Sequence, residues 1–362
     1  MKTPLSKLRQ SIDDVDGQIA RLLNKRAELA LSVGKSKNLA ATAGAGKAVY
    51  VPSREKEVLK KVKAASRVSK GKLSGESLEA IYCEIISACR NLDTPNKIAF
   101  LGPWATFSHQ AAIKNFGSSG FFIPTATAGE ALKEVESGRA DFAVVPVENS
   151  NEGSVNGTLD ILVETELKIC AEISLKIEQS FLVKDQKVQP LRIYSHSHAL
   201  AQCQTWLARN YPDAELIPVS STAEAAKKAS KESSAAAVAS EAAGKIYKLF
   251  VLQKGIQDNR ENFTRFFVVG KILTKPTGKD KTSLVFIVKD KVGALYNILG
   301  VFNKNKVNLT KIESRPTKKK AWEYMFFVDI EGHIDDAKIV KTLGELKKHL
   351  TFIKTLGSYP KA

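Results

Sequence analysis

Residues that could bind a small anion follow an apolar run in the middle of the chain. The run, residues 142–147, predicts a buried strand, and Glu148, Asn149 and Ser150 come directly after it. In open α/β sheets the carboxyl ends of strands face the ligand, beside helix N-termini that favour anions. The same pattern also fits a strand-to-helix turn without a function, because such turns are common.

A second polar group lies at the start of a later strand. Residues 266–269 predict a buried strand, and Thr264 and Arg265 stand at its entrance. We expect both side chains to face a cleft opposite the first polar group. A threonine that caps a strand and an arginine that reaches the surface would explain an isolated Thr-Arg-Phe as well.

Cations near the N-terminus suggest a separate site. Arg9 and Arg26 lie 17 positions apart, which is about 25 Å along one helix and too far for both to hold one small ligand. An antiparallel helix from a second chain would bring Arg9 of one subunit beside Arg26 of the other. Lys37 and Arg54 could complete a ring of cations, although a single basic residue on a helix is more often only solvated.

The elements that carry these cations are predicted to be helical. Apolar residues between positions 5 and 33 recur mostly every three or four residues, which predicts one long amphipathic helix. Gly34 ends the strong pattern, and residues 38–51 predict a loop. Further helices are expected from Arg54 and from Ser74, a plausible N-cap, to Leu92. Three such helices cannot close a core alone, so we expect a helical homodimer.

The middle of the chain alternates strands, helices and turns up to residue 269, which predicts two α/β lobes around a cleft. Its first strand, residues 98–101, runs into a Gly-Pro turn. Thr106 and Ser108 then lie at the mouth of a helix over residues 109–115.

Residues 274–282 predict a charged linker that bears Pro and Gly. The patterns beyond it predict strand, helix, strand, strand, helix and strand, at residues 283–288, 294–303, 308–314, 322–330, 335–348 and 352–356. That βαββαβ order is ferredoxin-like. The predicted fold is therefore multidomain: all-α over residues 1–93, two-lobed α/β over residues 97–273, and α+β over residues 281–362.

Charge weakens a nucleic-acid interpretation. The chain has 362 residues and a net charge of +17. Basic residues outnumber acidic ones by 18 to 10 in residues 1–95 and by 17 to 9 in residues 278–362, whereas the middle is almost neutral. Aromatic residues do not interleave with basic ones, so a basic surface that attracts a dicarboxylate fits better than a nucleic-acid binder. The nucleic-acid binder stays open as a rival and would show an affinity that falls steeply with salt.

Cysteine spacing and apolar runs predict a cytosolic protein without a metal site. The four cysteines form no C-x-x-C pair, so free thiols are expected. No apolar run approaches the roughly 20 residues of a membrane span, and the N-terminus lacks a signal-peptide pattern. His196 and His198 have no carboxylate cluster nearby in sequence, so we expect satisfied loop histidines and not metal ligands.

The segments that carry these residues resemble the family of bifunctional chorismate mutase/prephenate dehydratases, also called P-proteins. Residues 141–162 (DFAVVPVENSNEGSVNGTLDIL) resemble the prephenate dehydratase signature, and residues 98–112, 195–203, 235–249 and 261–270 fit the same family in the same order. LRQSIDDVDGQIARLLNKR at residues 8–26 resembles a chorismate mutase. GALYNIL at residues 293–299 and ESRP at residues 313–316 resemble an ACT domain.

The mutase resemblance implies a site that works through charge alone. Chorismate is a dianion, and its rearrangement to prephenate is pericyclic, so the enzyme binds the folded conformer and places positive charge at the breaking ether. The residues that match this site are Arg9, Arg26, Lys37, Arg54 and Glu55, with Cys89 where serine is usual and Asp93 where glutamine or glutamate is usual.

The dehydratase resemblance implies a fold like that of periplasmic binding proteins, in which the chain crosses to a second lobe near Ile173 and returns near Gln257. By this resemblance Thr264 is the essential residue, Arg265 binds carboxylate and Phe266 packs the ring. The substrate is expected to meet Thr106, Ser108, Glu148, Asn149 and Ser150, without a metal or organic cofactor. The family's Gly-Pro-x-Gly-Thr reads Gly-Pro-Trp-Ala-Thr here, so Ala105 is strained if its φ is positive.

The ACT resemblance implies control by phenylalanine. Gly293, Ala294 and Leu295 match a helix start that would receive the amino acid's carboxylate, while Glu313 and Ser314 match a strand end where Glu313 would meet the ammonium. The resemblance thus predicts a bifunctional enzyme of phenylalanine biosynthesis that phenylalanine inhibits. The rivals are a structural ferredoxin-like module and a non-catalytic amino-acid sensor, against which the Thr-Arg-Phe triplet argues.

Overall fold

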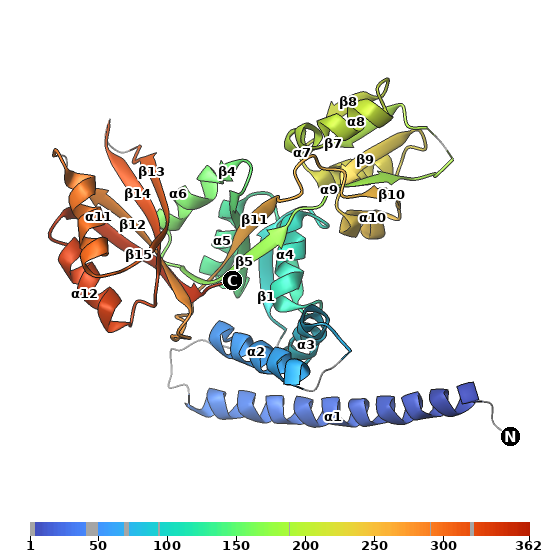
Figure 1. Cartoon of the computed structure of the whole chain (residues 1–362), viewed down its shortest axis with the longest axis horizontal. Helices are drawn as coiled ribbons and strands as arrows, with labels where there is room; N and C mark the ends of the chain where they lie inside the picture. Colours follow the sequence, from blue (N-terminus) through green and yellow to red (C-terminus); the bar gives the residue numbers. More distant parts are fainter. Residues whose placement is uncertain are drawn as a thin grey trace. The chain divides into compact units, whose positions relative to one another are not determined.

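The computed structural model describes residues 4–40, 50–68, 72–92, 95–187, 189–289, 291–318 and 322–362, with the side chains of 37–40 and 66–68 left out. The chain divides into two compact units (Figure 1). One unit contains the N-terminal residues up to Asn96 together with Phe116–Phe121, and the other contains Lys97–Asn115 and Phe122–Ala362. In the described residues no helix combines the length and the apolar character that a membrane crossing needs.

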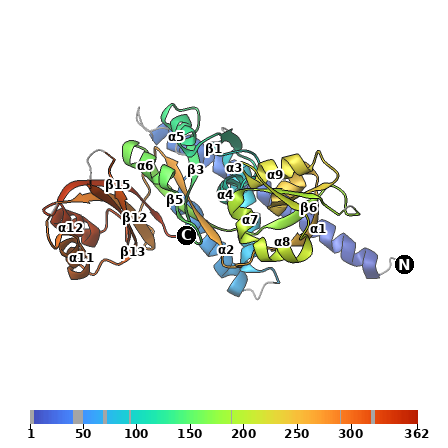
Figure 2. The ribbon, with the colours of Figure 1, turned by 90° about the horizontal axis from the view of Figure 1, so that it is seen from above.

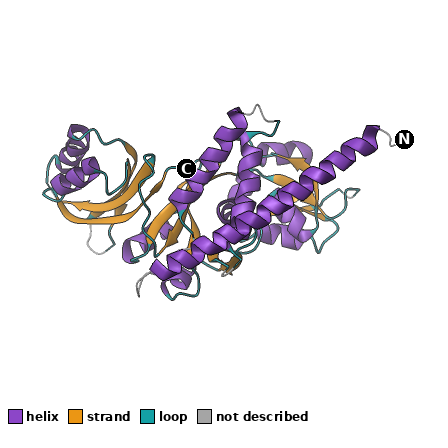
Figure 3. Cartoon of the chain, turned by 90° about the horizontal axis from the view of Figure 1, so that it is seen from below, coloured by secondary structure: helices purple, strands orange, loops and turns teal. Residues whose placement is uncertain are grey.

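The first unit is built on three long helices: α1 (Pro4–Ala40), α2 (Pro52–Val68) and α3 (Gly75–Arg90). Ser74 caps α3 as predicted, because its Oγ accepts a hydrogen bond from the Ser77 amide at 3.1 Å. Gly34 does not end α1, which continues to Ala40 as one helix (Figure 3). A single glycine inside a helix costs only about 1 kcal/mol relative to alanine, and the stability of the flanking helical turns offsets this cost.

The predicted apolar stripe of α1 lies open in one chain. Leu8, Ile12 and Leu22 keep 64%, 60% and 66% of their surface exposed. An amphipathic helix is expected to pack its apolar face against another surface, and in one chain this face of α1 stays exposed.

The first lobe of the second unit is a six-stranded sheet in the order β2-β1-β3-β11-β5, with β4 paired to β3. Strand β1 runs parallel to β3, whereas β11 returns antiparallel between β3 and β5. The elements are β1 (Lys97–Leu101), α4 (Phe107–Phe116), β2 (Phe121–Thr125), α5 (Ala128–Glu136), β3 (Phe142–Asn149), β4 (Gly153–Ser154), α6 (Asn156–Glu164), β5 (Lys168–Lys176) and β11 (Phe263–Gly270).

The second lobe is a five-stranded sheet in the order β10-β6-β9-β7-β8, so the predicted two-lobed α/β architecture is confirmed. The chain leaves the first sheet after Lys176 and returns to it at Phe263, a few residues beyond the predicted crossings at Ile173 and Gln257. The elements are β6 (Ser180–Val183), β7 (Arg192–Ser195), α7 (Ser197–Gln202), α8 (Gln204–Asn210), β8 (Glu215–Pro218), α9 (Thr222–Ala229), β9 (Ala235–Ala239), α10 (Glu241–Tyr247) and β10 (Phe250–Lys254).

The C-terminal module has the predicted βαββαβ order, with two helices on one face of a four-stranded sheet (Figure 2). Its strand order is β13-β14-β12-β15. The elements are β12 (Asp280–Val288), α11 (Ala294–Lys304), β13 (Leu309–Pro316), β14 (Tyr324–Glu331), α12 (Ala337–Leu346) and β15 (Leu350–Pro360). Strand β12 begins three residues earlier than predicted, because the Asp280 carboxylate accepts hydrogen bonds from the amides of Thr277 and Gly278 and orders the turn before it.

The other face of this sheet shares a core with the first lobe. Val285, Phe327 and Leu356 are buried in one cluster with side chains of β3, α6, β5 and β11. At Gly357 the backbone of β15 comes so close to β5 that an added Cβ would lie 2.7 Å from the Ile169 amide nitrogen. The C-terminal module is therefore packed into the second unit and is not tethered only by its linker.

Candidate active sites

The first two polar groups meet where β3 and β11 pair. Asn149 and Thr264 are direct partners in the ladder, and the Asn149 amide nitrogen lies 2.8 Å from Thr264 Oγ1. Contrary to the sequence pattern, Glu148 and Asn149 belong to β3 and do not follow it, because pairing with β11 extends the strand through polar residues.

The contacts of Asn149 determine how its amide is oriented. Its Nδ2 donates to Thr264 Oγ1 and, at 2.9 Å, to Oδ1 of the fully buried Asn262. Its Oδ1 accepts from the amides of Asn151 and Glu152 at 2.9 and 3.2 Å. Because Thr264 Oγ1 accepts a hydrogen bond from Asn149, its own hydrogen points elsewhere and can be donated to a ligand.

The network continues to Gln202 and Glu152, which the sequence analysis did not single out. Asn262 Nδ2 donates to Gln202 Oε1 at 3.0 Å, and Gln202 Nε2 donates to Glu152 at 3.3 Å. Gln202 lies on α7 of the second lobe, so the network joins the two lobes. Both residues stood inside matched segments, and only pairing between distant segments could have singled them out.

The two histidines lie beside this network. His196 caps α7, and its Nδ1 accepts from the His198 amide at 3.4 Å. His198 Nδ1 lies 3.5 Å from a carboxylate oxygen of Glu152. Burial lowers the pKa of His196. In the described part of the chain, no three His, Cys, Asp or Glu side chains are grouped closely enough to hold a metal ion.

Ser150 and Glu148 do not join Asn149 in contacting Thr264. The Ser150 hydroxyl donates to the Glu261 carbonyl at 3.2 Å and accepts from the Phe263 amide at 3.0 Å, so it holds the two strand ends together. The Glu148 carboxylate lies 3.1 Å from Lys311 of the C-terminal module.

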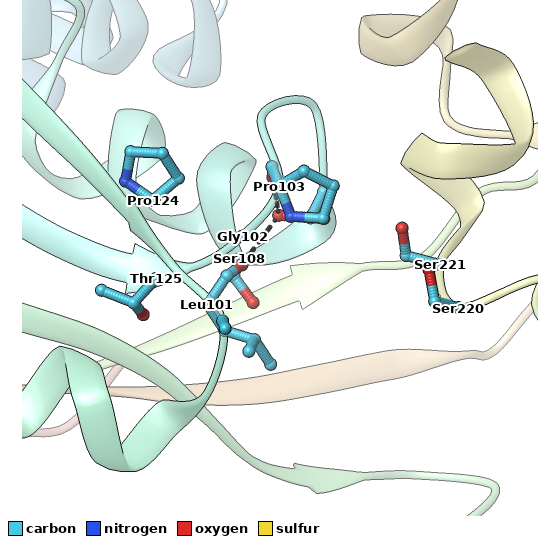
Figure 4. Close-up of a pocket in the computed structure, with 10 residues that line it drawn as sticks. Leu101, Gly102, Pro103, Ser108, Pro124, Thr125, Ser220 and Ser221 are labelled. Atoms are coloured by element: carbon cyan, nitrogen blue, oxygen red, sulfur yellow. Dashed lines mark hydrogen bonds between the residues drawn. The ribbon is translucent and has the colours of Figure 1, made fainter. Parts of the chain in front are cut away.

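Thr106 and Ser108 line a separate part of the lobe boundary, a cavity of about 500 Å³ (Figure 4). The Thr106 hydroxyl donates to the carbonyls of Leu101 and Pro103 at 3.0 Å and accepts from the His109 amide at 3.3 Å. Ser220 and Ser221 from the second lobe line the same cavity, with Ser221 as the N-cap of α9. The start of α4 and the start of α9 therefore both present amides near this space, as an anion requires.

The loop that shapes this cavity holds Ala105 in the strained conformation that the sequence analysis considered. Ala105 has a φ of +70°, which costs an alanine more than the glycine usual there. Its amide donates to His109 Nδ1 at 3.3 Å. His109 is 5% exposed and packs against Phe100, Trp104 and Phe122, and burial lowers its pKa to about 4.

The expectation that Thr264 and Arg265 both face the cleft is wrong for Arg265, whose side chain lies away from Thr264 because successive side chains of a strand alternate between faces. Its guanidinium contacts Glu172, Asp329 and Tyr359, at distances between 2.5 and 2.9 Å. Burial alone would lower the pKa of Arg265, but these neighbours raise it well above its ordinary value. Phe266 is 1% exposed and belongs to the core. The carboxylate-binding role of Arg265 and the ring-packing role of Phe266 stay predictions.

Among the mutase candidates that the structure describes, Arg9 and Arg26 lie too far apart on one helix to hold one small ligand within a single chain. Arg9 is exposed and Arg26 half-buried, far apart on α1. Arg54 pairs with Glu57 at 2.6 Å, and Cys89 is a half-buried free thiol. The side chain of Lys37 and the whole of Asp93 lie outside the described residues.

Glu55 is held by an arginine that the sequence analysis did not consider. Arg90 Nη1 lies 2.5 Å from Glu55 and its Nη2 donates to the Phe116 carbonyl at 2.7 Å. The guanidinium lies over the rings of Tyr50 and Phe116, at 5.3 and 5.4 Å from their centroids. Arg90 thus orients the one acidic mutase candidate that the structure describes.

The five regulatory candidates lie on two elements of the C-terminal module. Gly293 has a φ of +76° and is the N-cap of α11, where Ala294 and Leu295 begin the helix. Glu313 and Ser314 lie on β13, with Glu313 hydrogen bonded to Ser154 of β4 and 3.3 Å from Lys311.

Three family models match successive parts of the chain: chorismate mutase type II over residues 8–94, prephenate dehydratase over residues 98–272 and the ACT domain over residues 282–348. A bifunctional chorismate mutase/prephenate dehydratase of Aquifex aeolicus is 49% identical over 99% of this chain and 98% of that protein. The protein of the same name from Escherichia coli is 32% identical over 99% of this chain and 97% of its own length.

A solved structure supports the same grouping for the second unit. The crystal structure of prephenate dehydratase from Arthrobacter aurescens in complex with L-Phe superposes with a TM-score of 0.68 at 36% identity and covers 74% of this chain and 90% of that one. With relatives this similar over nearly its whole length, the chain belongs to the family of bifunctional chorismate mutase/prephenate dehydratases with a C-terminal ACT domain.

Proposed function

We propose that Thr264 and Asn149 form the reaction centre of the dehydratase. The observation that carries this proposal is the 2.8 Å hydrogen bond from Asn149 to Thr264 Oγ1. Because Asn149 occupies a lone pair of the hydroxyl, the hydroxyl hydrogen is left to be donated to a substrate oxygen.

The proposed reaction converts prephenate to phenylpyruvate, carbon dioxide and water. The bond between the ring and its carboxylate breaks, its electron pair becomes a ring double bond, and the bond to the ring hydroxyl breaks with it. Thr264 donates a hydrogen bond to the departing hydroxide, which takes up one proton from the solvent and leaves as water. Aromatisation drives the reaction, so the protein has only to position the substrate and stabilise the leaving group.

We assign the prephenate carboxylates to the cavity lined by Thr106 and Ser108. Two helix starts face this space, α4 from the first lobe and α9 from the second. Closure of the lobes over a dianion would bring both toward it, since helix N-termini favour negative charge.

For the mutase, we propose a site shared between two copies of the chain. Arg9 and Arg26 lie about 25 Å apart on one helix, and the apolar stripe of α1 is exposed in a single chain. Antiparallel pairing of α1 helices would cover the stripe and bring Arg9 of one copy beside Arg26 and Arg54 of the other. Lys37, Glu55, Cys89 and Asp93 complete the set by family resemblance.

The ACT domain is proposed to bind phenylalanine, which inhibits the dehydratase. The Arthrobacter aurescens enzyme binds L-Phe, which supports this assignment. Here Gly293, Ala294 and Leu295 would receive the carboxylate at the start of α11, and Glu313 with Ser314 would meet the ammonium. A biosynthetic enzyme with four free cysteines is expected to work in the cytoplasm.

The test is to supply purified protein with chorismate and, separately, with prephenate, and to follow phenylpyruvate. Thr264→Val should lower the dehydratase kcat by about 10²- to 10³-fold, as expected when a donor to a developing negative charge is removed, and should spare the mutase. Thr264→Ser should retain most of the activity. Thr351→Val, an exposed position on β15, is the matched control. Full dehydratase activity in Thr264→Val would contradict the proposal.

A further inference from the structure

Strands β3 and β11 carry two kinds of side chain in alternation. In the ladder Asn149 pairs with Thr264, and the preceding pair is Glu148 with Arg265. The first pair forms the proposed reaction centre. The second pair contacts the C-terminal module, through Lys311 and Asp329. Each residue of the proposed reaction centre is therefore the sequence neighbour of a residue whose side chain contacts the regulatory domain.

The contacts of Arg265 form a closed ring of hydrogen bonds. Arg265 donates to Asp329 at 2.5 Å and to the Tyr359 hydroxyl at 2.9 Å. The Ser283 hydroxyl donates to Asp329 at 2.5 Å, so the 2.6 Å bond between Ser283 and Tyr359 has the tyrosine as donor. Every member of the ring therefore has its partner, and three of the four members belong to the C-terminal module.

The ring is buried and balanced in charge. The side chains of Arg265 and Asp329 are 16% and 7% exposed, and that of Glu172, which contacts Arg265 at 2.8 Å, is 3% exposed. Lys281 of the C-terminal module also contacts Glu172, at 3.0 Å. Arg265 also lies 3.6 Å from Glu148, which Lys311 contacts at 3.1 Å, so three cations face three carboxylates. The cavity beside these residues has a volume of only about 10 Å³. The hydrogen-bonded ring therefore has little room to rearrange unless β11 is displaced with it.

A displacement of this hydrogen-bonded ring would also displace Thr264, because neighbouring residues of one strand move together. Thr264 immediately precedes Arg265, and the Asn149 amide can follow only as far as its bond to Asn262 allows. Misplacing a catalytic group by about 1 Å can cost about 10² in rate.

We propose that Asp329 and Tyr359 of the ACT domain are positioning residues for the dehydratase, acting on Thr264 through Arg265. Neither residue is among those assigned above to the substrate or to the effector. The inference rests on the proposed role of Thr264 and deepens it, because the regulatory domain becomes part of what holds the reaction centre in place.

The rival explanation is that these contacts only attach the domain. Asp160 provides the matched control, since it pairs with Arg315 at 2.9 Å and with Lys318 at 2.8 Å across the same domain boundary but lies on α6, outside β3 and β11. Asp160→Asn removes attachment without touching the ring.

The experiment compares Asp329→Asn, Asp329→Glu, Tyr359→Phe and Asp160→Asn in the full chain. We expect Asp329→Asn to lower the dehydratase kcat by about tenfold or more with KM changed less than about twofold, and to shift the phenylalanine concentration for half inhibition by about fivefold or more. Tyr359→Phe should change both quantities in the same direction but by less. Asp329→Glu should lose less activity than Asp329→Asn, and Asp160→Asn should keep the wild-type kcat.

Mutase activity of the same preparations reports folding of the first unit, and Tyr359→Phe keeps the proposal testable if Asp329→Asn does not fold. Wild-type kcat and phenylalanine response in both Asp329→Asn and Tyr359→Phe would overturn the inference, as would an equal loss in Asp160→Asn. If Thr264→Val kept full activity, the proposed function itself would fail, which is a separate outcome.

Discussion

At the scale of single residues, the hydrogen-bond direction at Asn149 determines what Thr264 can do. An aspartate at position 149 would be isosteric, but an ionised carboxylate only accepts. The Thr264 hydroxyl would then donate to it and would have nothing to give a leaving group. The amide is thus as important to the proposed chemistry as the hydroxyl, although it need not touch the substrate.

His109 gives a residue-scale prediction about pH. Its pKa is about 4 when folded, against about 6.5 unfolded, because it is buried among aromatic rings. Between these values the unfolded state binds more protons, so the free energy of unfolding falls as pH drops from 6.5 to 4. The full contribution, at most about 3 kcal/mol, is present above pH 6.5.

Urea unfolding between pH 4 and 7.5 checks this, with His109→Gln as the comparison. Glutamine keeps an acceptor for the Ala105 amide but does not titrate, so the variant should lose the part of the slope that His109 provides. An identical pH dependence in the two proteins would show that the wild-type histidine is not held neutral.

At the scale of elements, the close approach of β15 to β5 makes Gly357 sensitive to substitution. A Cβ there would lie 2.7 Å from the Ile169 nitrogen and closer still to its carbonyl oxygen, both of which are backbone atoms that cannot swing aside. Gly357→Ala should therefore destabilise the second unit by about 1–3 kcal/mol, the usual range for overpacking.

Thermal unfolding measures the effect, and Gly344→Ala provides the matched control in the same domain. Gly344 lies in α12, where an added Cβ would meet open space within 4 Å, so alanine should be neutral or stabilise the helix by up to about 1 kcal/mol. A melting temperature in Gly357→Ala equal to that of Gly344→Ala would mean that the two strands separate easily.

Elements with strong periodicity were predictable from the sequence. The α1 stripe, the Ser74 cap and the βαββαβ order all follow from local patterns and are present in the structure. The end of β3 was predicted too early, since its last two residues are polar and only the partner strand makes them part of the sheet. Local pattern also could not place Arg265, whose partners lie 64 to 94 positions away in sequence.

At the scale of the whole molecule, the proposed shared site predicts that one chain alone is an incomplete mutase. Arg9→Ala and Arg26→Ala should each abolish mutase activity, whereas mixed chains should regain it in heterodimers. Each heterodimer would have one site with both arginines and one with neither. Random mixing should thus restore about a quarter of wild-type activity, as expected for a two-fold symmetric dimer.

Differently tagged chains allow the heterodimer to be purified after unfolding and refolding of the mixture. Dehydratase activity should be the same in every sample, which controls for recovery of folded protein. Purified heterodimers without mutase activity would rule out the shared site and require both arginines to act elsewhere.

The alternation along β3 and β11 also limits how this enzyme could be redesigned by exchanging domains. A gene fusion made between Gly270 and Asp280 looks natural, since it cuts between β11 and β12. It would nonetheless leave Glu148 and Arg265 in the host, facing a foreign sheet. A transplanted regulatory domain would need an acidic residue in place of Asp329 and a hydroxyl group in place of Tyr359. Otherwise the host would need apolar residues in place of Glu148 and Arg265. The unit that must be transferred together is therefore larger than the ACT domain, because it includes Glu148 of β3 and Arg265 of β11.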